Sequence, residues 1–116
     1  SAVIIPNGNG CTYYSYAGDG KVITMNYNNI DDALAAAKAA NYTREQHWQL
    51  TAQQASWARD AAAAFHNTDY HETTHNCWHM VFAALEAAGT DAVDDGAHPN
   101  KSFNANKHFC DGWSDL

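Results

Sequence analysis

The first third of the chain alternates between apolar and polar residues with the two-residue period of a β-strand. The alternation is seen in segments 12–16 and 21–27. In the second segment the apolar set is Ile23, Met25 and Tyr27. Between the two segments, Gly18-Asp19-Gly20 supplies the residues that a tight hairpin turn requires. The pattern therefore predicts an N-terminal β-hairpin.

In the middle of the chain the apolar period changes to three or four residues, which is typical of helices that bury one face. Residues 31–40 form an alanine-rich segment with acids in its first turn, and we expect a helix there that ends at Asn41. Thr43-Arg44-Glu45-Gln46 fits a capping box, which predicts a second helix from Thr43 to Phe65. Its apolar stripe consists of Trp48, Ala52, Ala55, Ala58, Ala62 and Phe65.

A third helix is predicted from Asn76 to Ala88. Asn76 is a favourable N-cap residue, and Gly89 suits the position that follows a helix. The buried stripe of this helix consists of Val81, Ala84, Leu85 and Ala88. From Thr90 onward the chain is rich in Asp, Gly and Asn, so we expect a loop with one short strand.

Together these elements predict an α+β fold in which an N-terminal β-hairpin packs on about three helices. The chain has 116 residues, a length that favours a single domain covering residues 1–116. Hydrophobic residues make up 46% of it, which is enough for a modest core. No apolar run approaches the roughly 18 residues that a membrane span needs.

The charge balance restricts the partners that we expect. The chain has 6 Lys and Arg residues against 13 Asp and Glu residues, and its net charge is −7 with neutral histidines. Nucleic acids and anionic membranes attract basic surfaces, so we expect neither as a partner. The scarcity of Lys and Arg, together with many Asn, Tyr and Trp residues, favours a secreted protein.

The three cysteines differ in their positions along the chain. Cys11 and Cys110 lie near its two ends, and Cys77 lies between them. A Cys11–Cys110 disulfide would close a long loop and stabilise the fold by about 4 to 5 kcal/mol in the chain-entropy model. We therefore predict this bridge, which leaves Cys77 as an unpaired and reactive thiol.

Segment 70–80, with the sequence Tyr-His-Glu-Thr-Thr-His-Asn-Cys-Trp-His-Met, concentrates reactive side chains. With Asn76 as N-cap, Cys77 falls in the first helical turn, where backbone N–H groups and the helix dipole stabilise a thiolate. His75 is the histidine closest to Cys77 outside the helix, and it is a candidate for the base. We predict Cys77 as a nucleophile, with His75 and Asn76 as the other catalytic residues.

This segment also resembles a family signature. Tyr70, five further residues and Asn76-Cys77-Trp78-His79-Met80 resemble the Tyr-x5-Asn-Cys-x-His-Phe signature of lecithin:retinol acyltransferase-like proteins. These are circularly permuted relatives of papain, allied to the NlpC group of cell-wall amidases. The stretch Tyr16-Ala17-Gly18-Asp19-Gly20-Lys21-Val22-Ile23 resembles the Tyr-Val-Gly-Asp-Gly strand pair of the same family. The resemblance covers residues 12–89 at low identity.

The resemblance implies a permuted papain-like core and a cysteine hydrolase or acyltransferase that forms an acyl-enzyme at Cys77 without a cofactor. The implied substrate is a peptide, a peptidoglycan-type amide or a lipid ester. One position departs from the family. Its catalytic histidine belongs on the first strand, at a position that matches Thr12 here, and no histidine precedes His47. The base must then come from elsewhere, and the candidates are His75, His79, His98 and His108.

An alternative chemistry is open because His71-Glu72-Thr73-Thr74-His75 fits the zinc motif HExxH. On a helix, His71 and His75 would share one face and bind zinc, and Glu72 would act as general base. Candidates for the third ligand are His79, Asp91, Asp94, Asp95 and His98. This alternative is a zinc metallopeptidase. The β-branched Thr73 and Thr74 disfavour the helix that it needs.

A third hypothesis is a secreted toxin, effector or metal-binding protein without catalysis. Seven histidines are many for this length, and His71, His75 and His79 could bind a metal that does no chemistry. The tyrosines and tryptophans would then serve mainly as packing residues. The reactivity of Cys77 separates this hypothesis from the first one.

Overall fold

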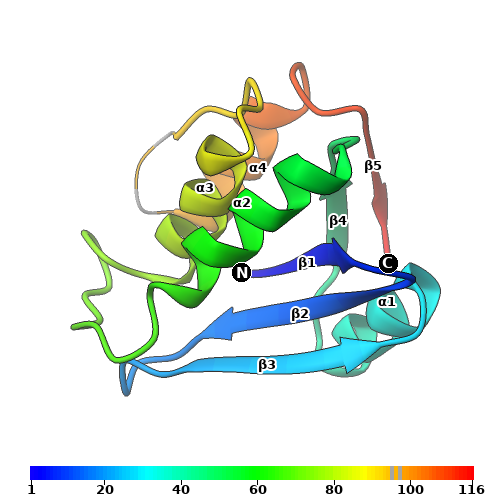
Figure 1. Cartoon of the computed structure of the whole chain (residues 1–116). Coiled ribbons are helices and arrows are strands. Elements are labelled where there is room, and N and C mark those ends of the chain that lie inside the picture. The colour runs from blue at the N-terminus through cyan, green and yellow to red at the C-terminus, as the bar shows by residue number, and fades with distance from the viewer. Residues whose placement is uncertain (95, 97) are drawn as a thin grey trace.

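Within residues 1–94, 96 and 98–116, which the computed structural model describes, the chain forms two antiparallel sheets and four helices (Figure 1). This arrangement confirms the predicted α+β class. In chain order the elements are β1 (Ala2–Asn7), β2 (Gly10–Tyr16), β3 (Val22–Tyr27), α1 (Ile30–Ala39), β4 (Arg44–His47), α2 (Ala52–Ala63), α3 (Cys77–Ala87), α4 (Pro99–Asn106) and β5 (Gly112–Asp115). No helix in this described part of the chain is long and apolar enough to cross a membrane.

The larger sheet has the order β1-β2-β3, with β2 in the centre. The predicted hairpin is confirmed as β2 and β3, whose pairing runs from Cys11 with Tyr27 to Tyr16 with Val22. Strand β1 was not predicted. It pairs with β2 through a second hairpin, in which Gly8 adopts a φ of 61° that favours glycine.

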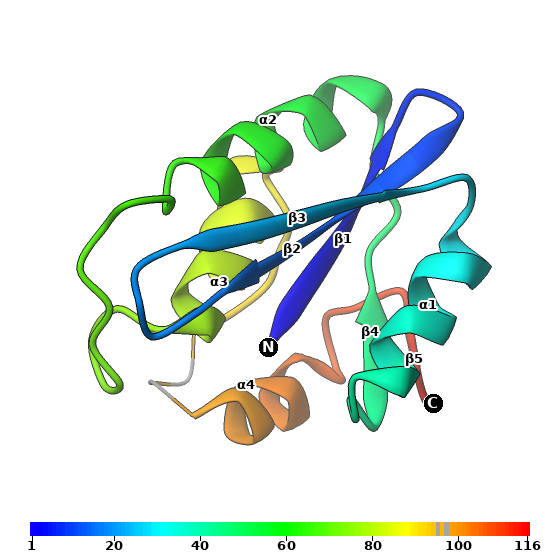
Figure 2. The same ribbon diagram turned by 90° about the horizontal axis from the view of Figure 1, so that it is seen from below.

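The two faces of this sheet are covered differently. Because side chains alternate along a strand, Tyr14 and Tyr16 of β2 point to one face and Tyr13 and Ser15 to the other. On the first face, α2 and α3 complete the core (Figure 2). Its buried residues are Ile5, Tyr14, Tyr16, Val22, Ala55, Ala58, Ala62, Met80, Ala84 and Ala88. Helix α1 contacts the sheet near Cys11, whose thiol donates to the Asn29 carbonyl at 3.4 Å.

The predicted start of the second helix is wrong. Thr43 begins no helix, because residues 44–47 form β4 and pair with β5 near the other end of the chain. The helix α2 starts after Thr51, whose side chain accepts a hydrogen bond from the Gln54 backbone while the Gln54 side chain accepts one from Thr51. A second capping box with the same pattern as that of Thr43 therefore marks the true helix start.

The tail contains one more helix than we predicted. Helix α4 begins with Pro99, a favourable first helical residue, and buries the polar side chains of Ser102 and Asn106. The Asn106 amide accepts from the Val93 N–H at 2.7 Å and donates to the Val93 carbonyl at 2.8 Å. The helix is thus attached by polar contacts, which an apolar pattern does not reveal. The expected short strand is present as β5.

We predict that two methionines differ sharply in their contribution to stability. Met80 has an exposed fraction of 0%, whereas Met25 on β3 is 51% exposed. Met80→Ala should lower the free energy of unfolding by about 2–5 kcal/mol because it leaves a cavity in the core. Met25→Ala should change it by less than about 0.5 kcal/mol. Urea denaturation of both variants checks this, and equal losses would contradict the placement of the core.

Candidate functional site

The start of α3 is fixed by the side chain of Asn76. This amide is only 4% exposed, and its Oδ1 accepts hydrogen bonds from the backbone N–H groups of Trp78 at 3.0 Å and His79 at 3.3 Å. In return, the Asn76 backbone N–H donates to His79 Nδ1 at 3.0 Å, which completes a capping box. Cys77 is therefore the first residue of the helix, at the positive end of its dipole, and its predicted position in the first turn is confirmed.

The loop before α3 folds the HExxH motif into a turn. His71 and His75 pair as an isolated antiparallel bridge. The His71 N–H donates to the His75 carbonyl with 2.9 Å between nitrogen and oxygen, and the His75 N–H donates to the His71 carbonyl at 3.0 Å. The Asn76 side chain closes this loop by donating to the Glu72 carbonyl at 2.7 Å. The motif is not helical, so the shared helix face that the zinc metallopeptidase alternative requires is not formed.

His75 packs into an aromatic cluster. Its ring stacks on Phe65 with 4.6 Å between centroids and meets Tyr16 edge-on at 5.7 Å. Its Nε2 lies 3.2 Å from the Thr68 hydroxyl. Among the described residues no hydrogen bond joins His75 to Cys77, so the role of His75 as base stays a prediction.

The other histidines and acids that the sequence suggested are dispersed. His79 belongs to the helix cap, whereas His98 and His108 are exposed at the two ends of α4. Asp91 and Asp94 accept hydrogen bonds from the indole N–H groups of Trp48 at 3.1 Å and Trp78 at 2.9 Å. Asp95 lies outside the described residues. Among the residues that are described, no group of three or more His, Cys, Asp or Glu side chains is placed to hold a metal ion.

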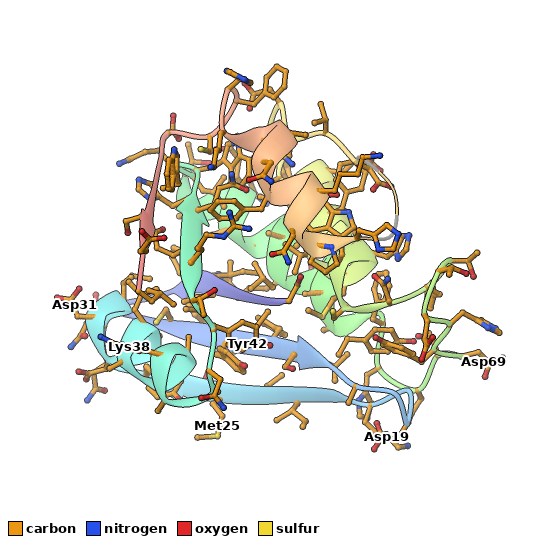
Figure 3. The ribbon with its side chains drawn as sticks, turned by 180° about the vertical axis from the view of Figure 1, so that it is seen from behind. Asp19, Met25, Asp31, Lys38, Tyr42 and Asp69 are labelled. Atoms are coloured by element: carbon orange, nitrogen blue, oxygen red, sulfur yellow. The ribbon has the colours of Figure 1, made fainter. Side chains whose placement is uncertain are left out.

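The thiol of Cys77 has polar neighbours from both sides of the sheet. The backbone nitrogen of Ser1, immediately before β1, donates to Cys77 Sγ at 3.0 Å. The hydroxyl of Tyr70 interacts with both the backbone and the thiol of Cys77. Tyr42, which follows α1, lies against the outer face of the sheet (Figure 3) and interacts with Tyr13 as well as with Cys77. Cys77 itself is partly exposed and packs in part against the core.

Both tyrosines near the thiol stay protonated at neutral pH. Burial raises the pKa of Tyr42 to about 12, and its hydrogen bond with Tyr13 adds to the rise. Burial also raises the pKa of Tyr70, and the electrostatic effect of Cys77 adds to the rise. The Tyr70 hydroxyl is therefore a neutral hydrogen-bonding group at the thiol, whereas the Tyr42 hydroxyl hydrogen-bonds with Tyr13 and Ser15.

A cavity of about 780 Å³ extends from Ser1, which contacts the Cys77 thiol, along β1 as far as Pro6. Ser1, Tyr42 and Trp78 line it near the thiol. Apolar side chains from β1, α1 and α3 also line it, among them Ile4, Ile5, Leu34, Val81 and Leu85. Its volume lies within the range of about 300–1,000 Å³ that is usual for ligand sites. Sequence reasoning could not find this cavity, because residues 1–6, 30–50 and 78–103 meet only in the fold.

The position that matches the histidine of the resembling family lies away from the thiol. Thr12 pairs with Ile5, whereas Ser15 pairs with Ala2, next to Ser1. Three residues of β2 separate Thr12 from Ser15, which is about 10 Å at the rise of a strand. Its hydroxyl donates to Asn26 Oδ1 at 2.8 Å and accepts from Asn7 Nδ2 at 3.1 Å. This position is therefore used in joining the three strands, and a histidine placed there would not be next to Cys77.

All three cysteines are free thiols, so the predicted Cys11–Cys110 bridge is not formed in this structure. Cys11 is 2% exposed and lies within the larger sheet beside α1. Cys110 is partly exposed and follows α4, in the turn that leads to β5 (Figure 1). Proximity of the chain ends therefore does not bring these two sulfur atoms together.

We predict that Cys77 and Cys11 react at very different rates. Burial and the charge of Asp32 raise the pKa of the Cys11 thiol, and alkylation requires an accessible thiolate. At pH 8, iodoacetamide should modify Cys77 roughly ten times faster than Cys11 or more. Peptide mass spectrometry measures both rates, and protein unfolded in urea, in which all three thiols are accessible, is the control. Equal rates in the folded protein would contradict this account.

Comparisons with known proteins provide no neighbour for this site. The chain matches no protein-family model, no curated protein and no solved structure.

Proposed function

We propose that the protein is a small secreted cysteine hydrolase or acyltransferase in which Cys77 attacks an amide or ester carbonyl. The observation that carries this proposal is a partly exposed thiol at the first residue of α3, where the helix dipole stabilises a thiolate. The thiol also contacts Ser1, and Ser1 lines a cavity large enough for a substrate. Cys11 also lies near a helix start, but it is buried, and its thiol donates to the carbonyl of Asn29, the N-cap residue of α1.

The reaction proceeds through a thioester. The Cys77 thiol loses its proton to solvent, and the thiolate sulfur forms a bond to the carbonyl carbon while an electron pair moves to the carbonyl oxygen. When the bond to the leaving group breaks, this pair re-forms the carbonyl, and the leaving amine or alcohol takes up a proton. Water then cleaves the thioester in a hydrolase, or another alcohol or amine does so in an acyltransferase. Both routes regenerate the Cys77 thiol.

The oxyanion of the first step needs hydrogen-bond donors next to Cys77. The N–H groups of Trp78 and His79 already donate to Asn76, so they are not free for this purpose. The Tyr70 hydroxyl lies at the thiol, and we assign its O–H group as one donor. The second donor is the Cys77 N–H, which hydrogen-bonds with the Tyr70 hydroxyl in the free protein and would have to turn from it to the oxyanion. The raised pKa of Tyr70 supports this role, because the hydroxyl keeps its proton at neutral pH.

Membership of the lecithin:retinol acyltransferase-like or NlpC-type group, with a permuted papain-like core, is part of this proposal. Two placements support it: Tyr70 of the signature lies beside Cys77, and residues 17–21 join β2 to β3 as the strand pair of the family would. The base is the unassigned part. His75 is the candidate closest in sequence, and its ring would have to leave Thr68 to reach the thiol.

We predict that an activated ester leaves its acyl group on Cys77. With p-nitrophenyl acetate, one acetyl group should be found on the intact protein, and peptide mapping should place it on Cys77. Cys77→Ala should lose the adduct and reduce nitrophenol release to the background rate.

Cys110→Ala is the matched control, because Cys110 is also a free and partly exposed thiol but does not lie at a helix start. This variant should acylate as fast as the unmodified sequence. Loss of the acetyl group in Cys110→Ala, or the absence of an acetyl group on Cys77, would show that the proposed nucleophile is wrong.

A further inference from the structure

The cavity borders the free edge of β1. This strand pairs with β2 on one side only, and all its residues from Ala2 to Pro6 line the cavity. In Figure 2, β4 and β5 stand apart from β1 as a separate pair. The cavity is therefore bounded on one side by the edge of a strand, in addition to apolar side chains.

The hairpin register identifies the backbone groups at this edge. β1 and β2 are joined by a two-residue turn, so the flanking pair Asn7–Gly10 exchanges hydrogen bonds across the ladder. Because such pairs alternate along antiparallel strands, the N–H and C=O groups of Ala2, Ile4 and Pro6 point away from β2.

One of these three positions is already used. Pro6 has no N–H, and its carbonyl accepts a hydrogen bond from the Arg59 side chain. For Ala2 and Ile4, no other segment of the described chain supplies a backbone partner at this edge. Two N–H groups and two carbonyl groups at the cavity are therefore available to a ligand.

These groups decide which kind of ligand suits the cavity. An acyl chain would fill the apolar volume, but it would take the open N–H and C=O groups out of water without giving them a partner, which is costly. An extended peptide fills the same volume and can hydrogen-bond with the edge, as in the binding mode in which a peptide adds a strand to a sheet. The strand edge therefore favours a peptide over a lipid.

We propose that the cavity binds an extended, uncharged peptide segment as an added strand along β1. Six residues of β1 span about 20 Å, which sets a length of about five or six residues for the peptide. The acidic and basic side chains that line the cavity, Arg44, Glu45 and His47, all belong to β4. The wall formed by β1 and α3 is apolar, which favours Val-like or Leu-like side chains at alternate peptide positions.

The position of the cavity also relates the peptide to the thiol. Ser1 lines the cavity and donates to Cys77 Sγ, so a peptide that follows β1 to its beginning comes next to the residue that contacts the sulfur atom. Binding of the peptide stands on the strand edge alone. Cleavage of the bound peptide, which would make it the substrate, rests on the proposed function of Cys77.

The test measures peptide binding without catalysis. In the Cys77→Ala protein, an acetylated hexapeptide amide of alternating Val and Thr is titrated while hydrogen exchange of the backbone amides is followed by NMR. We expect saturable binding and slower exchange at Ala2 and Ile4. Saturable binding that leaves both amides unprotected, for instance at the other edge strand β3, would overturn the proposal, and so would a lack of binding.

A pair of variants isolates the backbone contact. Ile4→Pro removes one outward N–H but leaves the ladder to β2 intact, because an edge strand tolerates proline at such a position. It should weaken peptide binding about tenfold, whereas Ile4→Val should change it less than about threefold. If Ile4→Pro fails to fold, hexapeptides N-methylated on alternate residues replace it. One of the two methylation registers should abolish binding to the Cys77→Ala protein, and equal binding of both would overturn the proposal.

The Ile4→Pro and Ile4→Val variants also distinguish a lipid site from a peptide site. A fluorescent fatty acid that binds in the cavity with equal affinity in Ile4→Pro and Ile4→Val, while the hexapeptide does not bind, would overturn the proposal. This result is independent of the chemistry of Cys77. Failure of acylation at Cys77 with intact peptide binding would instead remove the proposed enzyme and leave a peptide-binding site.

Discussion

The rest of the site depends on the hydrogen bonds of the buried Asn76 side-chain amide. Its oxygen accepts from the backbone N–H groups of Trp78 and His79 in the first turn of α3, and its nitrogen donates to the Glu72 carbonyl. One side chain therefore ends a loop and begins a helix. This arrangement places Cys77 at the helix start and directs Met80 into the core. A short apolar side chain at this position would leave buried donors without partners, at a cost of about 1–3 kcal/mol for each group.

Local sequence signals predicted the elements correctly wherever no long-range contact determined the structure instead. The turn residues 18–20 marked the β2–β3 hairpin, and Asn76 with Gly89 marked both ends of α3. The prediction failed at Thr43, because a capping box also fits a strand whose partner, β5, lies about seventy residues later. It also failed for α4, whose buried face consists of Ser102 and Asn106 and therefore has no apolar stripe.

The candidate site was predictable only in part. Position along a helix follows from local sequence, so the placement of Cys77 could be derived. The neighbours of its thiol come from the first strand, from the loop after α1 and from Tyr70, and only the fold brings these together. The histidines illustrate the same limit, because their number in the sequence suggested a base or a metal, whereas His75 and His79 are held by packing and capping contacts.

The most direct test of the account is a crystal structure of the protein with an acetylated Val/Thr pentapeptide that ends in an aldehyde. We expect a covalent bond between Cys77 Sγ and the aldehyde carbon, with the new hydroxyl near Tyr70 and the peptide extended along β1. An aldehyde that leaves Cys77 unmodified, or a peptide bound away from the β1 edge, would contradict the claim that this thiol and this cavity form one site.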